Sequence, residues 1–349
     1  MQRKSHPLVS IVLLNYNGSR FANLWSSLFT LDYPSYEIIF VDNGSSDSSL
    51  SSFERLAKSY PNLATKTVRL EINVGYSKGN NIGLEHAFGE YVVLLSNDIA
   101  VSPDWLKNMI RYLDSAPKTA IAQSMMFSLS TRDQPDMMWN YINVLGFNHR
   151  FEPSGEVKEV FYSEGAVMFI RRSVLREVGE LFDPDYFMLD EDIDLCWRVR
   201  LKGMNVVVVP DSIVYHERGG TVQGAITKLD PKYARTNARN RLATLFKNYE
   251  ASNVIKYVPL TMGLELVKGM WLIKKGWKNS GIACFKGVWQ FAIDIPALTR
   301  KRAFVQSLRT VPDRDITKLM PGPADAIRSL LFYSNKVREL ENTHILDNR

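Results

Sequence analysis

The sequence contains only two cysteines, Cys196 and Cys284, among 349 residues. Two cysteines this far apart form neither a disulfide framework nor the paired spacing of a metal knuckle. We therefore expect a protein of a reducing compartment, the cytoplasm. Apolar residues make up 45% and charged residues 23% of the chain, which is ordinary for a globular protein. The chain is too long for one small core, so two domains are expected.

Long hydrophobic runs are also missing. No stretch of about 18 uncharged apolar residues occurs, so the sequence predicts no transmembrane helix. The apolar run Leu8–Leu14 is short and stops at the polar turn Asn15-Tyr16-Asn17-Gly18. This pattern is typical of a first β-strand and not of a signal peptide.

Two common phosphate-binding motifs are absent as well. A dinucleotide-binding fold would show G-x-G-x-x-G after its first strand, but only Gly18 stands there. The P-loop pattern G-x-x-x-x-G-K-[ST] does not occur. These absences disfavour the two commonest nucleotide sites of a parallel sheet.

What the sequence does contain is a regular alternation of strand and helix patterns in its first part. Strands are predicted at 8–14, 36–41, 65–70 and 91–95, between helical patterns that include 21–28, 48–60 and 104–113. Such βαβ units predict an α/β fold with a mostly parallel central sheet and helices on both faces. Ligands of such sheets bind at the carboxyl ends of the strands, where Asp42, the Gly/Asn loop 73–83 and Asp98 fall.

The later chain is less regular and then helical. Further strands are predicted at 160–170, 205–209 and 213–217, with a helix at 171–178, and helices at 232–248, 254–275, 283–298 and 324–340. The stretch 125–160 breaks the alternation, although its aromatic segment 139–151 argues for order. We expect a first domain at 1–230. A basic, mostly helical region should follow at 231–349.

Charge divides the chain in the same way. From residue 225 to the end there are 22 lysines and arginines against 10 acids, a balance of +12, which leaves −6 for the preceding residues because the whole chain carries +6. Basic regions attract phosphate, nucleic acid or anionic lipid, but no nucleic-acid-binding motif accompanies this one. Nucleic acid is therefore not an expected partner.

The basic region combines tryptophan and lysine on apolar helices. Trp271, Trp277 and Trp289 stand among several lysines, and Arg300-Lys301-Arg302 follows. Helices of this kind lie at anionic membrane surfaces, where replacing the 300–302 cluster by alanine would weaken binding. A basic helical subdomain packed on the rest of the protein would give the same pattern, and both interpretations stay open.

Four carboxylates crowd into five residues at Asp190, Glu191, Asp192 and Asp194. A helical pattern follows them, with Asp194 four residues before Arg198, so the acids sit at a helix N-terminus that favours negative charge. Capping and first-turn placement explain some of them. A catalytic acidic cleft would explain the rest, because crowded carboxylates have raised pKa values that suit a general base.

Three more residues near the strand ends could bind a ligand or a metal ion. Asp42 could accept hydrogen bonds from a base or ribose, or could only stabilise a turn. Asp98 is the ligand type that Mg²⁺ or Mn²⁺ prefers, with substrate phosphates completing the coordination. His216 could be a metal ligand, although a lone histidine is more often structural.

A series of short motifs runs along the chain in a fixed order. They are Val9-Ser10-Ile11-Val12 with Asn15-Tyr16-Asn17; Val41-Asp42-Asn43-Gly44-Ser45-Ser46-Asp47; Asn73-Val74-Gly75 with Gly79-Asn80-Asn81-Ile82-Gly83; Leu95-Ser96-Asn97-Asp98; Gly165-Ala166 with Arg171-Arg172; Phe182-Asp183 with Phe187; Glu191-Asp192-Ile193-Asp194-Leu195 with Arg198 and Gly203; and Tyr215-His216. Each motif alone is weak. In this order and spacing, over about residues 7–250, they resemble the inverting glycosyltransferases of family 2, with the GT-A fold, close to the rhamnosyltransferase-like branch.

The resemblance implies that the first domain has a donor half of about 1–115 and an acceptor half of about 116–230. It also implies roles for particular residues. The donor pocket would comprise Asn15, Asn17, Asp42, Asn73, Gly75, Asn80 and Asn97; the metal site Asp98 and His216; and the catalytic group Asp192 as base with Glu191 and Asp194 in support. The donor would be a nucleotide-diphospho-sugar, the metal Mg²⁺ or Mn²⁺, and the acceptor a glycan or a polyprenyl-diphosphate-linked sugar at the inner membrane face. Ser96 stands where the family's metal motif often has Asp or Asn, which would weaken metal binding or leave it to Asp98 and the diphosphate.

Two other functions remain alternatives. A sugar-phosphate nucleotidyltransferase would need a glycine-rich, basic phosphate loop after the first strand, of which Asn15–Arg20 is a poor version. A non-catalytic sugar-binding or scaffold protein would not need Asp42, Asp98, Asp192 and His216 together.

Overall fold

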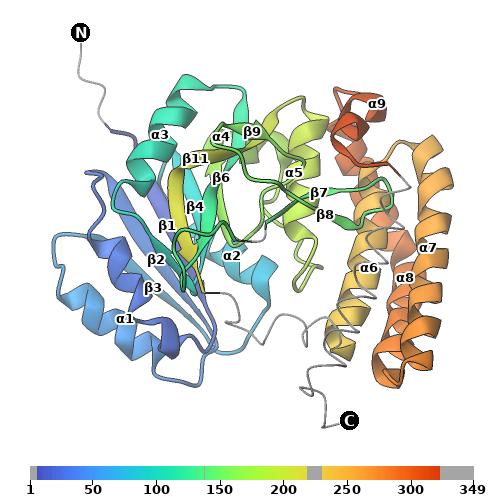
Figure 1. Cartoon of the computed structure of the whole chain (residues 1–349), viewed down its shortest axis with the longest axis horizontal. Helices are drawn as coiled ribbons and strands as arrows, with labels where there is room; N and C mark the ends of the chain where they lie inside the picture. The colour runs from blue at the N-terminus through green and yellow to red at the C-terminus, as the bar shows by residue number, and fades with distance from the viewer. Residues whose placement is uncertain (1–5, 137, 218–229, 323–349) are drawn as a thin grey trace. The chain divides into compact units, whose positions relative to one another are not determined.

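The computed structural model describes residues 6–136, 138–217 and 230–322. The chain divides into two compact units, one of residues 1–138 and 152–220 and the other of residues 139–151 and 221–349 (Figure 1). Segment 139–151, which the sequence-based boundaries left in the first domain, therefore belongs by its contacts to the second unit. The helix predicted at 324–340 lies outside the described residues.

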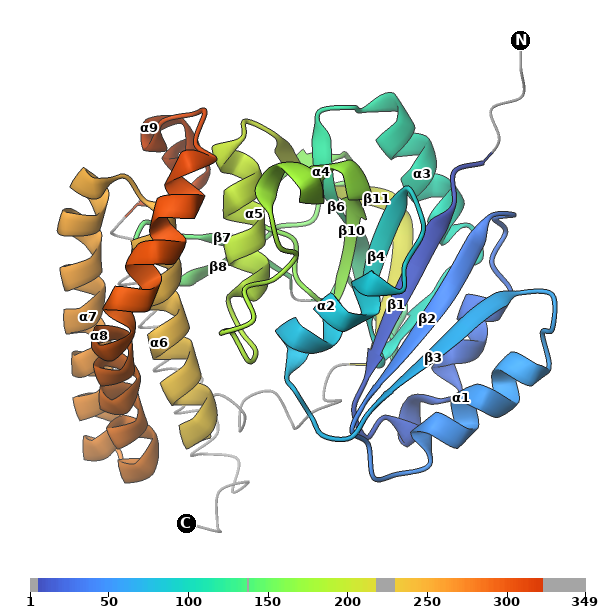
Figure 2. The same ribbon diagram turned by 180° about the vertical axis from the view of Figure 1, so that it is seen from behind.

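The first unit is built on a nine-stranded sheet. Its first half is parallel, in the order β3 (Ala64–Leu70), β2 (Tyr36–Asn43), β1 (Val9–Asn15) and β4 (Tyr91–Ser96), as Figure 2 shows. All seven residues of β1 are buried, as an inner strand of a parallel sheet requires. The α/β prediction with a mostly parallel central sheet is confirmed.

The second half of the sheet is mixed. It continues with β10 (Val167–Arg171), β6 (Thr119–Ser128), β11 (Asn205–His216) and β5 (Ile99–Val101), and β9 (Lys158–Glu159) pairs with β11. Strand β10 runs antiparallel to both of its neighbours, whereas β6 and β11 are parallel. The sequence-based assignment missed β6, and it split β11 in two at Pro210, where the register shifts between Val209 and Ile213.

Helices accompany this sheet. They are α1 (Ser49–Lys58), α2 (Tyr76–Glu85), α3 (Trp105–Ser115), α4 (Arg172–Val178) and α5 (Glu191–Leu201). The predicted helix at 21–28 consists of two 3-10 segments, η1 (Ser19–Phe21) and η2 (Leu24–Phe29). Trp25 of η2 forms a fully buried aromatic cluster with Phe40 and Phe53. The rings of Phe40 and Phe53 stack with centroids 4.2 Å apart. The predicted strand at 160–170 begins only at Val167.

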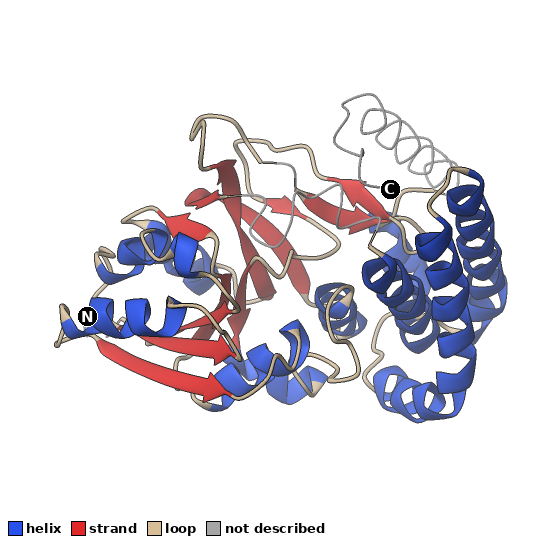
Figure 3. Ribbon diagram, turned by 90° about the horizontal axis from the view of Figure 1, so that it is seen from below, coloured by secondary structure: helices blue, strands red, loops and turns tan. Residues whose placement is uncertain are grey.

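The second unit is mainly helical. It comprises the hairpin β7 (Trp139–Ile142) and β8 (Asn148–Arg150), the helices α6 (Pro231–Asn248), α7 (Ala251–Lys274) and α8 (Lys278–Ser307), and the short α9 (Asp313–Ile316) and η4 (Thr317–Leu319), as Figure 3 shows by element type. Helix α6 begins where the Asp230 carboxylate accepts from the N–H of Lys232 at 2.7 Å and Pro231 takes the first position. None of the helices in the described part of the chain combines the length and apolarity needed to cross a bilayer.

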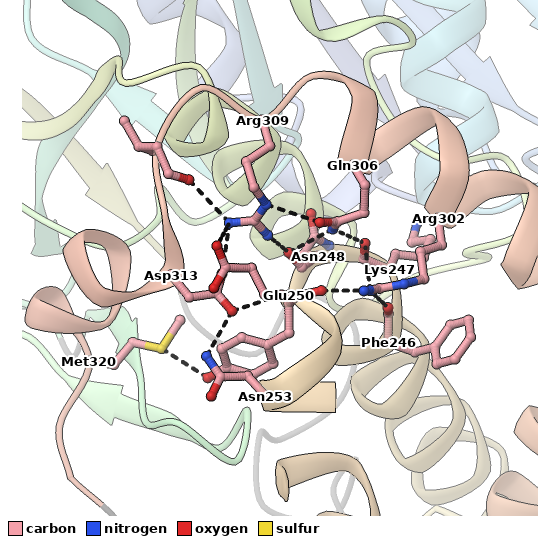
Figure 4. A network of polar contacts seen from close by, with 12 residues as sticks. Phe246, Lys247, Asn248, Glu250, Asn253, Arg302, Gln306, Arg309, Asp313 and Met320 are labelled. Atoms are coloured by element: carbon pink, nitrogen blue, oxygen red, sulfur yellow. Dashed lines mark hydrogen bonds and ion pairs between the residues drawn. The ribbon is translucent and has the colours of Figure 1, made fainter. Parts of the chain in front are cut away.

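Side chains from α8 close the carboxyl end of α6 (Figure 4). Arg302 donates to the carbonyls of Phe246 and of Tyr249, the latter at 2.6 Å, and Gln306 donates to those of Lys247 and Asn248. These bonds satisfy carbonyls that the helix itself leaves unpaired, and the cation complements the helix dipole. Arg302 is therefore a structural residue, unlike its exposed neighbour Arg300.

Candidate active site

The ends of the first parallel strands gather the polar residues that the sequence singled out. Asn15 at the end of β1 is paired in register with Asp42 on β2, and Leu14 is paired with Ser96 at the end of β4. Asp42 is 2% exposed, and its Oδ1 accepts from the N–H of Ser45 at 3.3 Å. This hydrogen bond is the one that the turn interpretation of Asp42 requires.

Asparagine side chains tie this edge together. Asn97 Nδ2 donates to Asn15 Oδ1 at 2.8 Å, and Asn15 Nδ2 donates to Ser49 Oγ at 2.9 Å. Asn17 has a left-handed backbone (φ 49°), is exposed, and accepts from the Ser46 N–H at 2.9 Å. A Cβ on Gly18 would lie 2.2 Å from Asn15 Oδ1 and 2.3 Å from Asn97 Nδ2, so only glycine permits this arrangement.

The loop before α2 lies beside the same edge. Asn73 Oδ1 accepts from the Gly75 N–H at 2.9 Å, and Asn43 Oδ1 accepts from the Val74 N–H at 3.0 Å. Gly75 has a φ of +91°, and a Cβ there would also lie 2.4 Å from the Phe187 carbonyl oxygen. Asn80 is buried within α2, and its side-chain amide donates to the Tyr76 carbonyl of the same helix at 3.0 Å. This hydrogen bond stabilises the first turns of α2. Asn43 was not among the predicted site residues, although it directly follows Asp42.

One pair of hydrogen bonds joins this loop to the acidic cluster. Tyr76 Oη donates to the Gly165 carbonyl at 2.5 Å, and the Gly165 N–H donates to Asp192 Oδ2 at 3.0 Å. The Tyr76 N–H in turn donates to the Phe187 carbonyl at 2.7 Å. Three segments far apart in the sequence therefore meet at Gly165. Apart from its place in the Gly/Asn motif, nothing in the sequence identified the role of the Tyr76 hydroxyl.

The acidic cluster opens helix α5 as the sequence predicts. Leu189 and Asp190 precede it with left-handed backbones (φ 73° and 65°), a conformation that non-glycine residues adopt rarely and mainly at functional sites. Asp190 occupies the N-cap position, but its side chain makes no capping hydrogen bond. The strained turn brings Glu191 and Asp192 into the first helical turn.

These two acids are chemically distinct from surface carboxylates. Desolvation raises the pKa of Asp192 to about 6, although the N–H groups of Gly165 and Ile193 lower it. Desolvation and the charge of Asp192 raise the pKa of Glu191 well above its usual value. Asp192 is partly exposed whereas Glu191 is 6% exposed, so Asp192 is the one that a ligand can reach.

Asp194 faces the protein interior. Its Oδ2 lies 3.2 Å from Arg198 Nε, with both side chains nearly fully buried. Arg198 also donates to the carbonyls of Val178, Glu180 and Leu181 at 2.6–2.9 Å. The predicted pairing with Arg198 is present, and it gives Asp194 a structural task in anchoring α5.

His216 lies between two carboxylates. Its Nε2 is 3.4 Å from Asp98 Oδ2, and its Nδ1 is 3.0 Å from Asp136 Oδ2. Strand pairing explains the first contact, because His216 is paired with Ile99 and the Glu217 N–H donates to the Asp98 carbonyl at 2.9 Å. Burial lowers the pKa of His216, but the contacts with Asp136 and Asp98 outweigh it and raise the value to about 9. Asp136 lies in the irregular stretch and carried no motif that would have identified it.

The donor set fits a divalent cation only in part. An imidazole Nε2 beside a carboxylate, with the other ring nitrogen held by a second carboxylate, is a common arrangement of metal-binding histidines. Within the described ranges, however, no group of three or more His, Cys, Asp or Glu side chains could hold a metal ion. Asp98 and His216 would therefore need further ligands, such as substrate oxygens.

Comparison with curated proteins gives relatives that are similar to part of this chain. The poly-β-1,6-N-acetyl-D-glucosamine synthase of Staphylococcus epidermidis is 26% identical over 214 residues, which are 59% of this chain and 49% of that protein. The hexosyltransferase Agl10 of Haloferax volcanii, of low-salt glycan biosynthesis, is 25% identical over 57% of this chain and 63% of its own length. An uncharacterized protein of Sinorhizobium fredii is 28% identical over 62% of this chain, but over only 25% of its own length. The chain thus spans a quarter to about two thirds of these relatives.

Solved structures share the fold. A Pyrobaculum calidifontis mannosyltransferase in complex with GDP-mannose and Mn²⁺ superposes with a TM-score of 0.54 at 16% identity, covering 83% of this chain and 88% of that one. The Staphylococcus aureus TarS structure with UDP-GlcNAc gives 0.50 at 17% identity, covering 89% and 90%. At these identities the likeness is one of fold. Residues 6–231 match the family described as "Glycosyltransferase like family 2", and because this match covers well over half of the chain, the protein belongs to glycosyltransferase family 2.

Proposed function

We propose that the protein transfers a sugar from a nucleotide-diphosphate donor to a hydroxyl of a glycan or lipid-linked acceptor, with inversion and with Asp192 as the base. The observation that carries this proposal is the setting of Asp192. Its Oδ2 is held at 3.0 Å by the Gly165 N–H, and its pKa of about 6 leaves it mostly ionised yet basic near neutral pH. That balance is what a general base requires.

The chemistry assigns one task to each part of the site. The edge formed by Asn15, Asp42 and Asn73 offers amide and carboxylate groups for the base and ribose of the donor. Asp192 takes the proton from the acceptor hydroxyl as its oxygen attacks the anomeric carbon. The bond to the diphosphate breaks in the same single displacement, through an oxocarbenium-like transition state. Burial and the charge of Asp192 raise the pKa of Glu191 well above its usual value, which disfavours a second negative charge beside the base.

Asp98 and His216 are the proposed metal residues, with the donor diphosphate supplying further oxygens. Mn²⁺ or Mg²⁺ held there would offset the negative charge that builds up on the departing diphosphate. Two neighbours by fold, the P. calidifontis mannosyltransferase and GalNAc-T7, were solved with Mn²⁺. We further propose association of the basic second unit with an anionic membrane surface, where a polyprenyl-diphosphate-linked acceptor would reside.

Three sugars are candidates for the group that the donor carries. The motif resemblance proposes rhamnose, and the names of relatives and neighbours add N-acetylglucosamine and mannose. A thermal-shift screen of thymidine, uridine and guanosine diphosphates and their sugars, with Mn²⁺, would identify the base and test donor binding together. No stabilisation by any of them would contradict the proposal.

The role of Asp192 has its own experiment. We expect Asp192→Asn to reduce transfer at least about 1,000-fold while the calorimetric affinity for the nucleotide diphosphate stays within about twofold, because asparagine keeps the shape but cannot accept the proton. Asp185→Asn, at an exposed acid in the preceding loop, is the matched control. Normal transfer by the Asp192 variant would remove the base assignment.

A further inference from the structure

The outward face of α7 is apolar over most of its length. Six large hydrophobic side chains of this helix are exposed, namely Ile255 (77%), Leu260 (56%), Leu266 (37%), Val267 (55%), Met270 (56%) and Ile273 (38%). Pro259 and Gly263 share the exposed side. A contiguous apolar face of this length on a water-soluble surface marks an interaction site.

The inner face of the same helix contains a buried, charged residue. Glu265 is fully buried and forms ion pairs with Arg241 of α6 and, at 2.6 Å, with Lys268. Thr261, also fully buried, donates to the carbonyl of Leu145 in the β7–β8 hairpin at 3.2 Å. A helix of a globular protein normally turns its apolar side inward and its charges outward. In α7 the buried side holds the charged Glu265 together with the apolar Val258 and Leu272. The exposed side is also mainly apolar, so packing inside the unit does not account for it.

Positive charges flank this apolar face. Lys256 and Lys274 are the exposed charged residues of α7, and 18 residues separate them. That spacing corresponds to about five turns, which places both lysines on one line along the helix, about 27 Å apart. On α8, exposed Trp289 (67%) and Ile293 (54%) stand near the exposed cations Lys286 and Arg300.

Acidic side chains are missing from these outward faces within the described residues. The acids of α7 and α8 are Glu265, which is buried, and Asp294, which lies 2.7 Å from Arg239 of α6. Apolar side chains bounded by cations, with no acid between them, complement a surface of hydrocarbon beneath anionic headgroups.

We propose that the face of α7 from Lys256 to Lys274 docks on an anionic lipid bilayer, with the helix lying in the plane of the interface. The six hydrophobic side chains would enter the acyl boundary, and the two lysines would extend to the lipid phosphates. This deepens the proposed function, on which it rests for its purpose, by assigning membrane contact to one helix face. It also excludes Arg302 from the lipid contact, because its guanidinium is hydrogen-bonded to carbonyls at the carboxyl end of α6.

A second copy of the chain is the other occupant that an apolar face could take. In a two-fold related pair of α7 helices, an antiparallel arrangement brings Lys256 of one copy close to Lys274 of the other, and a parallel arrangement brings each lysine close to its own copy. Like charges without an acid between them oppose that pairing. The same lysines favour a negatively charged lipid surface, which is why the bilayer is the proposed occupant.

The test uses the full chain and vesicles of equal parts phosphatidylglycerol and phosphatidylcholine, with phosphatidylcholine vesicles as reference. We expect the protein to sediment with the anionic vesicles at low salt. The variant Ile255→Gln/Val267→Gln/Met270→Gln should lower the partition coefficient at least about tenfold, since it removes three apolar side chains that the bilayer would bury. The variant Lys256→Gln/Lys274→Gln should remove most of the preference for anionic vesicles and flatten the salt dependence.

Matched controls are available on the first unit. Phe88→Gln removes an apolar side chain of similar exposure (74%), and Lys58→Gln removes an exposed lysine; neither should change vesicle binding. Light scattering would detect self-association. The proposal is overturned if the triple variant binds vesicles as well as the unmodified protein does, or if the unmodified protein does not bind them. It is also overturned if the unmodified protein is a dimer and, of these variants, only the triple variant is a monomer. Donor binding, measured in the same samples by calorimetry, should be unaffected by all these variants, and its failure would count against the proposed function alone.

Discussion

Asp136 Oδ2 lies 3.0 Å from Nδ1 of His216, on the side of the imidazole ring opposite Asp98. A carboxylate in this position holds a proton on Nδ1, and because the pKa of His216 is about 9, Nε2 also carries a proton near neutral pH. A metal ion bound at Nε2 would replace that second proton and leave the Nδ1–H tautomer. The contact makes Asp136 a positioning residue for His216, since it would reach a metal ion only through the ring.

We therefore predict that Asp136→Asn weakens Mn²⁺ binding in the presence of a nucleotide diphosphate by about 10- to 100-fold, the usual effect of losing such a partner. Titration calorimetry gives the affinity, and NMR of the imidazole reports the tautomer. Asp98→Ala should abolish metal-dependent donor binding altogether. Asp133→Asn, at an exposed acid of the same stretch, is the control. An unchanged tautomer and Mn²⁺ affinity in the Asp136 variant would show that the carboxylate is not needed.

The sequence predicted the parallel half of the sheet well because β1, β2 and β4 are apolar runs that end in polar turns, with β3 as a mostly exposed edge strand. Their order along the chain then predicted Asp42, the loop 73–83 and Asp98 on one edge. Asp136 and Gly165 could not be found in this way, because their contacts are made across long sequence separations and outside regular elements. A hydrogen bond from a backbone N–H, as from Gly165 to Asp192, also cannot be predicted from the type of the donating residue, because nearly every residue has an N–H.

The same holds for the helices of the second unit. Their existence followed from periodicity, but the burial of Glu265 in α7 opposite an exposed apolar face did not. It depends on Arg241, which reaches Glu265 from another helix and also donates to the Gly146 carbonyl at 3.0 Å. Such a pairing is decided by tertiary packing and not by the local pattern.

The pH dependence of transfer should report the ionisation of Asp192. A base acts only when deprotonated, and the pKa of Asp192 is raised to about 6, so kcat/KM should fall below about pH 6 with a slope of one on a logarithmic scale. Above that pH the profile should be flat until another group titrates. Asp185→Asn should leave the profile unchanged. A profile that is level from about pH 5 to 7 would contradict the assignment of the base.

Asp194 should contribute to folding and not to chemistry. Asp194→Asn leaves the buried Arg198 guanidinium without its counter-charge, and breaking such a pair typically costs about 3–5 kcal/mol. We expect the free energy of unfolding in urea to fall by that order, while kcat at a temperature where the variant is folded stays within about threefold. Asp183→Asn on the preceding loop offers a comparison at another buried acid. A large loss of kcat with unchanged stability would instead give Asp194 a direct part in the reaction.

Tyr76 should act on turnover through Gly165. Tyr76→Phe removes the 2.5 Å hydrogen bond to the Gly165 carbonyl, and the peptide that donates to Asp192 then loses its anchor. An unsatisfied carbonyl costs about 1–3 kcal/mol, so part of the effect should appear as lower stability. The part that concerns function should appear as a kcat at least about tenfold lower, with the donor affinity unchanged, because a misplaced base harms the chemical step and not nucleotide binding. Tyr60→Phe, which keeps a ring packed against Phe29, is the matched control. If kcat and the pKa seen in the pH profile both stay at their original values in Tyr76→Phe, the link from Tyr76 to Asp192 has no catalytic consequence.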